Sequence, residues 1–188
     1  CKLCVKNSNG FITYEEDVNK NELDKSQWNG ITVFCEHNNG VIHKVTFELI
    51  GKAKELGKVI GHKVQVLVIG YNVSSLSKEL FAYGADEVYI YDNKKLENFL
   101  LDPYTNIFEN YINNVKPSSI LVGATSVGRA LAPRVAARLH TGLTADCTKL
   151  EMKENTDLVQ IRPAFGGNIM AEILTPTTRP QFCTVRYK

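Results

Sequence analysis

Apolar runs alternate with stretches of helical periodicity along the first part of the chain. The run at residues 64–69 is nearly continuous, which is typical of a strand buried on both faces of a sheet. The expected strands are residues 31–36, 64–69, 87–91 and 120–122. The helical stretches that follow them begin near Val45, Leu76, Asp102 and Val127. This β-α-β-α-β-α-β-α order predicts an α/β fold with a doubly wound, mostly parallel sheet.

The pattern changes near residue 147. Four strand-like runs follow with no room for helices between them, at residues 147–152, 158–162, 169–174 and 182–186. We expect these runs to form hairpins, which would add late antiparallel strands at one edge and make the sheet mixed. Pro133 interrupts the preceding helical pattern, so the regular helix either starts near it or is kinked there.

Length and charge limit the possible classes of protein. A chain of 188 residues is long enough for one good-sized core and too short for two ordinary domains. Its net charge of +2, without a long basic run, argues against a nucleic-acid partner. The chain has neither an apolar segment of membrane-spanning length nor a signal-peptide pattern at its start. We therefore expect a soluble, cytoplasmic protein.

The cysteines fall into two groups. Three lie within apolar or β-rich runs and are expected to be small core residues: Cys35, Cys147 and Cys183. Cys1 and Cys4 instead resemble the second and third cysteines of the bacterial iron–sulfur run C-x2-C-x2-C-x3-C-P. Ser8 stands where the fourth cysteine belongs, so this chain alone is expected to hold no four-iron cluster. We interpret residues 1–20 as a ferredoxin-like remnant, 21–29 as a linker and 30–188 as the main domain.

The first candidate site follows the strand at residues 120–122. Ligands of open α/β sheets bind outside the carboxyl ends of the strands, where Thr125, Ser126 and Arg129 are expected. The two hydroxyls can donate or accept hydrogen bonds, and Arg129 offers a fixed fork of donors for a phosphate or carboxylate. Ordinary turn chemistry after a strand gives the same pattern, so both interpretations stay open.

The second candidate site is the segment RPAFGGN between two late strands. Gly166, Gly167 and Asn168 permit unusual backbone angles and exposed amides, and Arg162 adds a permanent cation near Phe165. These groups suit a flavin or a phosphate. A glycine-rich hairpin turn, with an arginine paired to a surface carboxylate, explains the pattern equally well.

Two long segments resemble a known family. GATSVGRALAPRVAARLHTGLTADCTKLEM, followed by IRPAFGGNIMAEILTPTTRPQFCTVR, resembles the N-terminal domain of the electron transfer flavoprotein alpha subunit over about residues 29–188. The cysteine pair in front makes the chain similar to the ferredoxin-fused alpha subunits of flavin-based electron bifurcation.

The resemblance implies a Rossmann-like, adenine nucleotide alpha hydrolase-like domain that pairs with the beta subunit and helps enclose flavin. The family's C-terminal FAD-binding domain is expected beyond Lys188, so FAD would belong to the full complex and not to this chain alone. The complex would carry electrons between NADH, ferredoxin and an acyl-CoA dehydrogenase or reductase, and this chain would be a carrier subunit. By resemblance, the residues approaching the flavin are Arg162, Gly166, Gly167 and Asn168, with Thr125, Ser126 and Arg129 nearby.

Two other functions fit the same residues. A nucleotide-binding Rossmann-like domain would hold a phosphate at the GATSVGR segment. A ligand-free interaction scaffold would use its sheet edge and loops alone, and its partner binding would survive replacement of Arg129 and Arg162 by alanine.

Overall fold

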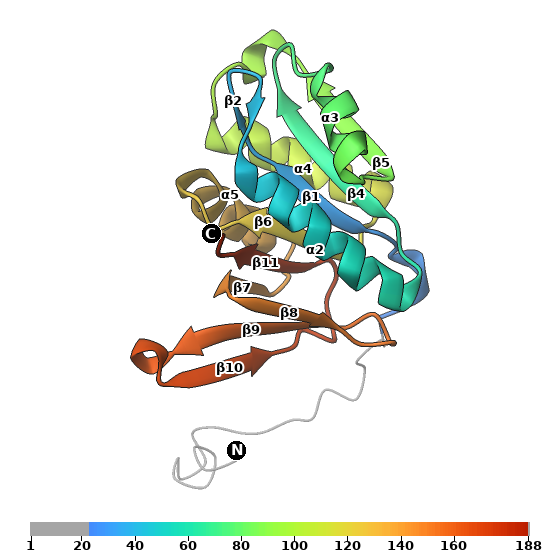
Figure 1. Cartoon of the computed structure of the whole chain (residues 1–188), viewed down its shortest axis with the longest axis vertical. Helices are drawn as coiled ribbons and strands as arrows, with labels where there is room; N and C mark the ends of the chain where they lie inside the picture. The colour runs from blue at the N-terminus through green and yellow to red at the C-terminus, as the bar shows by residue number, and fades with distance from the viewer. Residues whose placement is uncertain (1–22, 188) are drawn as a thin grey trace, which may run out of the picture.

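The computed structural model describes residues 23–187, so the predicted ferredoxin-like remnant with Cys1 and Cys4 lies outside the described residues. The main sheet has six strands in the order β5-β4-β1-β6-β11-β7, and every pairing in it is parallel (Figure 1). These strands are β1 (Ile31–Cys35), β4 (Val64–Gly70), β5 (Glu87–Asp92), β6 (Ser119–Gly123), β7 (Leu143–Cys147) and β11 (Gln181–Val185). The long helices are α2 (Lys44–Ile60), α3 (Leu76–Tyr83), α4 (Leu101–Val115) and α5 (Ser126–Arg138).

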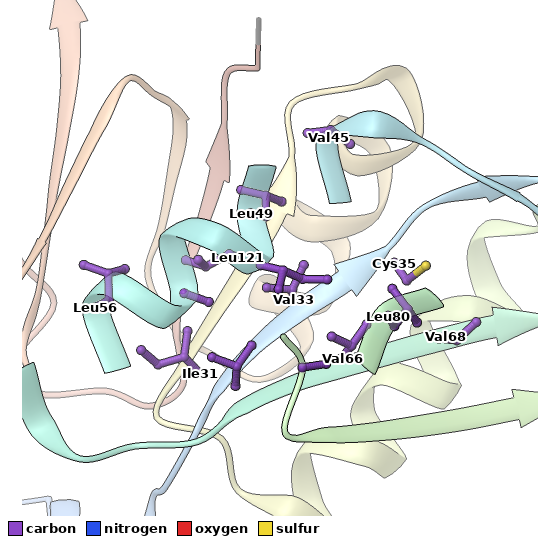
Figure 2. Close-up of a cluster of buried hydrophobic side chains, with 14 of the residues drawn as sticks. Ile31, Val33, Cys35, Val45, Leu49, Leu56, Val66, Val68, Leu80 and Leu121 are labelled. Carbon is purple, nitrogen blue, oxygen red and sulfur yellow. The ribbon is translucent and has the colours of Figure 1, made fainter. Parts of the chain in front are cut away.

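Helices cover both faces of this sheet. Side chains of α2 and α3 pack into one buried cluster, and side chains of α4 and α5 pack into a second one on the opposite face. Along β1, Ile31 and Val33 point into the first cluster while Phe34 points into the second, which explains the continuous apolar run. Figure 2 shows the first cluster, in which Leu49 and Leu56 of α2 lie over β1. The doubly wound fold predicted from the sequence is thereby confirmed.

The late strands follow the expectation only in part. β8 (Lys149–Met152), β9 (Leu158–Ala164) and β10 (Ile169–Ile173) form an antiparallel sheet of their own. The last strand, β11, instead enters the main sheet between β6 and β7 and runs parallel to both. The expected hairpin at residues 182–186 and the mixed main sheet were therefore wrong. Phe182 and Cys183 are both fully buried because β11 has neighbours on each side and helices or strands over each face.

One strand was missed, and one of the two alternatives given for Pro133 is excluded. The run at 147–152 is divided between two sheets, since β7 ends at Cys147 and β8 begins at Lys149. β7 contains polar Thr144 and Asp146 and is only partly buried at the sheet edge, so its apolar signal is weak. Pro133 lies well inside α5, so this helix does not start near it.

The segment that precedes β1 contacts the domain at several points. It contains a short 3-10 helix, η1 (Lys25–Gln27), and Nζ of Lys25 lies 2.8 Å from Oδ1 of Asp157 in the turn between β8 and β9. Trp28 packs against the second buried cluster, and the Asn29 amide donates to the Lys116 carbonyl at 3.0 Å. Residues 23–29 are therefore tied to both the antiparallel sheet and α4.

Several expectations about composition can be placed on the described residues. Cys35, Cys147 and Cys183 are fully buried free thiols, which confirms their role as core residues. In residues 23–187 no helix has the length and apolar character needed to cross a bilayer. The same residues contain no group of three or more His, Cys, Asp or Glu side chains placed to hold a metal ion.

Candidate functional site

The loop from β6 into α5 is organised by Thr125. Its side-chain oxygen accepts a hydrogen bond from the Gly128 amide at 3.0 Å, which is the usual N-cap contact of a helix. The same hydroxyl donates to Oε2 of Glu36 at 2.5 Å. Glu36 follows β1 directly, so the contact joins the carboxyl ends of two neighbouring strands. Ser126, the first residue of the helix, is exposed.

Glu36 changes what this helix end can bind. The amino end of a helix carries partial positive charge and exposed amides, which is why phosphates bind there. Here the chain places its own carboxylate beside the cap residue. A cavity of about 270 Å³ next to it is lined by Glu36, Glu97 and Tyr104, and its described lining contains no Lys or Arg. These groups weigh against the nucleotide-phosphate alternative at this position.

A close approach between α5 and β6 depends on Gly128. A β-carbon at this position would lie 1.9 Å from the Gly123 carbonyl oxygen, far inside contact distance. Glycine therefore lets the first turn of α5 lie directly against the end of β6. The approach holds Arg129, the next residue, at the carboxyl edge of the sheet.

Arg129 binds a carboxylate within the chain. Its Nε and Nη2 donate to the two oxygens of Asp146, both at 3.1 Å, in the bidentate arrangement that matches a guanidinium to a carboxylate. Asp146 lies in β7 in a left-handed conformation with φ of 59°. A register shift in the β11–β7 pairing occurs at the same place, between Cys183 and Val185. The carboxylate that Arg129 binds in this structure is therefore one of the chain's own.

Arg186 is a second cation at Asp146. Its Nη2 lies 3.8 Å from Oδ2 of Asp146, and its backbone amide donates to the Cys147 carbonyl at 2.9 Å. Sequence reasoning missed this residue, because a hairpin at 182–186 would have placed it away from the carboxyl edge. Its position immediately after an apolar run was the available signal.

Arg162 in β9 approaches the same end of β7. The pKa of the Cys147 thiol is lowered by a hydrogen bond with Cys183 and, against the effect of burial, by the positive charge of Arg162. The pKa of Cys183 is raised well above its usual value by that hydrogen bond and by complete burial. Arg129 and Arg162, predicted from separate segments, are thus both brought to the Asp146–Cys147 end of β7.

The glycine loop lies at the tip of the hairpin between β9 and β10. Its short 3-10 turn η3 (Phe165–Gly167) has three consecutive left-handed residues, with φ of 48°, 71° and 94°. The unusual angles predicted for Gly166 and Gly167 are present, and Phe165 shares them although it has a β-carbon. Figure 1 shows this tip, in orange and red, projecting beyond the main sheet.

The predicted site residues would suit one side of a flavin. Residues 165–170 are all exposed, and the Arg162 side chain makes no hydrogen bond within residues 23–187. Exposed loop amides and a free guanidinium fork fit a planar, electron-rich ring with anionic groups. Because the loop is open to solvent, it could contact one side of a flavin but could not enclose it.

A parallel sheet with helices on both faces and charged groups at its carboxyl edge defines a Rossmann-like α/β binding domain. The family model "Electron transfer flavoprotein domain" matches residues 31–188, and the chain belongs to this family.

Individual relatives agree with the family match. The chain is 63% identical, over its full length, to the lactate dehydrogenase (NAD(+),ferredoxin) subunit LctC of Acetobacterium woodii, of which it covers 45%. It is 44% identical to an electron transfer flavoprotein subunit alpha of Clostridium acetobutylicum, with 87% of this chain and 49% of the relative aligned. It is 39% identical to the acryloyl-CoA reductase electron transfer subunit beta of Anaerotignum propionicum, with 88% and 52% aligned. The chain spans about half the length of these relatives.

Proposed function

We propose that this chain is the first domain of an alpha-type electron transfer flavoprotein subunit, and that it pairs with a flavin-carrying beta subunit. The observation that carries the proposal is the apolar tip of the β9–β10 hairpin, where Phe165, Ile169 and Met170 are 82%, 55% and 54% exposed. Large side chains gathered in this way favour a protein interface. The relatives named as subunits support the same assembly.

In this assembly each site residue has a defined task. A flavin, when bound, supplies the electron-transfer chemistry. Arg162 would attract negative charge at the ring, and the amides of Gly166 and Gly167 would donate hydrogen bonds to it. Phe165 would exclude water from the contact. Asn168 adds a side chain that can both donate and accept.

The wider role would be electron bifurcation in the cytoplasm. NADH and ferredoxin would be the nicotinamide and iron–sulfur partners, because the 63% identical relative is named for NAD(+) and ferredoxin. That name favours a lactate-type dehydrogenase as the third partner. The acyl-CoA dehydrogenase or reductase expected from the sequence has its support in the 39% identical relative. FAD would be held by the complex, and any cluster involving Cys1 and Cys4 would need further ligands.

Mixing the chain with a beta subunit and FAD tests the pairing. We expect a stable 1:1 heterodimer by gel filtration, and Phe165→Asp should weaken it at least about tenfold by placing a charge in an apolar contact. Phe81→Asp is the matched control, because Phe81 is 49% exposed on α3, away from the hairpin. The pairing is wrong if the wild-type chain forms no heterodimer, and the assigned surface is wrong if only Phe81→Asp weakens the complex.

A further inference from the structure

Three arginines from distant parts of the chain approach the carboxyl end of β7. Arg129 comes from the first turn of α5, Arg162 from β9, and Arg186 from the residue after β11. Asp146 is the carboxylate that pairs with Arg129 and Arg186. Arg129, Arg186 and Asp146 together carry a net charge of +1, which favours an anion at this edge.

Most of the donors in this cluster are unused. Arg129 donates two N–H groups to Asp146. Nη2 of Arg186 lies 3.8 Å from Oδ2 of Asp146, and the Arg186 side chain forms no hydrogen bond within residues 23–187. The side chains of Arg129 and Arg186 are 56% and 54% exposed, and that of Asp146 is 24% exposed. The guanidinium of Arg186 and the N–H groups of Arg129 that Asp146 does not use are thus accessible beside one partly covered carboxylate. A forked guanidinium binds an oxyanion through two parallel hydrogen bonds.

Asp146 is held in place independently of the arginines. Its backbone amide donates to Oγ1 of Thr184 at 2.9 Å, at the register shift between β7 and β11. The shift and the left-handed backbone direct this side chain toward Arg129. The carboxylate therefore stays beside the two arginines, and the N–H groups that it does not use remain available.

We propose that Arg129 and Arg186 bind a phosphoryl group, which competes with the Asp146 carboxylate for these two cations. Two forks and an excess positive charge suit a divalent oxyanion better than a single carboxylate. This inference deepens the proposed function and rests on it for the identity of the flavin-carrying partner. The phosphoryl group has two chemical sources, a free nucleotide and the flavin nucleotide on the partner.

Calorimetric titration of the 188-residue chain with inorganic pyrophosphate tests the site directly. We expect saturable binding that weakens with salt, and a loss of about tenfold in affinity for Arg186→Gln and for Arg129→Gln. Asp146→Asn should tighten binding, since it removes the competing charge and asparagine tolerates the left-handed backbone. Arg138→Gln is the control on the same helix, because Arg138 pairs with Glu109 at 3.1 Å instead.

The inference is overturned if wild-type chain shows no saturable binding, if Arg138→Gln weakens binding as much as Arg186→Gln, or if Asp146→Asn abolishes it in a folded variant. Two further measurements distinguish the two sources of the phosphoryl group: titration with AMP, and binding to the flavin-loaded beta subunit. If the phosphoryl group comes from a free nucleotide, Arg186→Gln should weaken the binding of AMP. If it comes from the partner's flavin, Arg186→Gln should weaken binding to the flavin-loaded beta subunit. The absence of both effects contradicts the site. A normal heterodimer without pyrophosphate binding rejects only this inference, while pyrophosphate binding without a heterodimer rejects the pairing.

Discussion

Thr125 donates its hydroxyl hydrogen to Oε2 of Glu36 at 2.5 Å while its oxygen accepts from the Gly128 amide. One hydroxyl thus links the end of β1 to the first turn of α5. The carboxylate stabilises the positive end of the helix and takes the place that an anionic ligand would need. The proposed phosphoryl site consequently lies away from this helix cap, at Arg129 and Arg186.

Removing this hydroxyl should destabilise the domain. Thr125→Val keeps the shape but loses both hydrogen bonds, so we expect the free energy of unfolding to fall by about 1–2 kcal/mol. A double-mutant cycle with Glu36→Gln, measured by urea denaturation, should give a coupling of about 1 kcal/mol. Additive effects of the two substitutions would show that the Thr125–Glu36 contact contributes little.

Gly128 and Gly51 offer a matched pair of glycine-to-alanine substitutions within helices. Gly128→Ala should destabilise the domain by about 1–3 kcal/mol, because the new β-carbon meets the Gly123 carbonyl at 1.9 Å. Gly51→Ala in α2 meets nothing within 4 Å and should stabilise the helix by about 0.5–1 kcal/mol. Thermal unfolding measures both effects. Equal effects of the same sign would contradict the close approach of α5 to β6.

Asp157 should make stability depend on acid pH. Burial raises its pKa, but hydrogen bonds from Lys25 and Arg179 outweigh burial, and the net result is a pKa below the usual 3.8. Because the pKa of Asp157 is lower in the folded state than in the unfolded state, its ionised carboxylate stabilises the folded protein above pH 3.8. This stabilisation is lost as the pH falls through the folded-state pKa. We expect wild-type stability to decline from about pH 5 to about pH 3 more steeply than that of Asp157→Asn.

The same variant also tests the buried ion pair. The Arg179 side chain is 0% exposed and lies 2.7 Å from Asp157. At neutral pH, Asp157→Asn should therefore cost about 3–5 kcal/mol, because it leaves the buried Arg179 without a counter-charge. Parallel pH profiles for the two proteins would show that another group causes the acid dependence.

The sequence predicted those features that depend on local pattern. The apolar spacing of Val45, Leu49 and Leu56 determines which face of α2 is buried, and the structure agrees. β11 was misplaced because its mainly apolar run, FCTV, suits two different positions equally well. One is a buried strand of a hairpin, and the other is a central strand of a parallel sheet, which is the position that it takes. The local sequence does not distinguish these two positions. The choice depends on the space between β6 and β7, which β11 fills by pairing with both strands.

The candidate site shows the same division. The left-handed angles of Gly166 and Gly167 follow from residue type, so they could be predicted. The meeting of Arg129, Asp146 and Arg186 could not, because it requires β7 and β11 to be neighbours and their register to shift. Glu36 at the α5 cap likewise depends on β1 lying beside β6.

The isolated chain should be colourless. Its predicted flavin-contacting loop is open to solvent, so it lacks the enclosure that tight cofactor binding requires. We expect purified 188-residue chain to show no stoichiometric flavin absorbance, even after incubation with FAD and desalting. A retained, stoichiometric flavin spectrum would show that the loops of this chain suffice.

Charge reversal at Arg162 tests the flavin interface itself. Arg162→Glu replaces an attraction for negative charge by a repulsion, so the flavin of the heterodimer should become harder to reduce or be retained less well. Lys95→Glu is the control, because Lys95 is exposed and lies in the short turn η2 (Lys94–Leu96) after β5. Spectroelectrochemistry measures the potential, and gel filtration shows whether each variant still pairs. An unchanged potential and flavin content for Arg162→Glu, with a shift for Lys95→Glu, would place the flavin elsewhere and leave Arg162 as a surface cation.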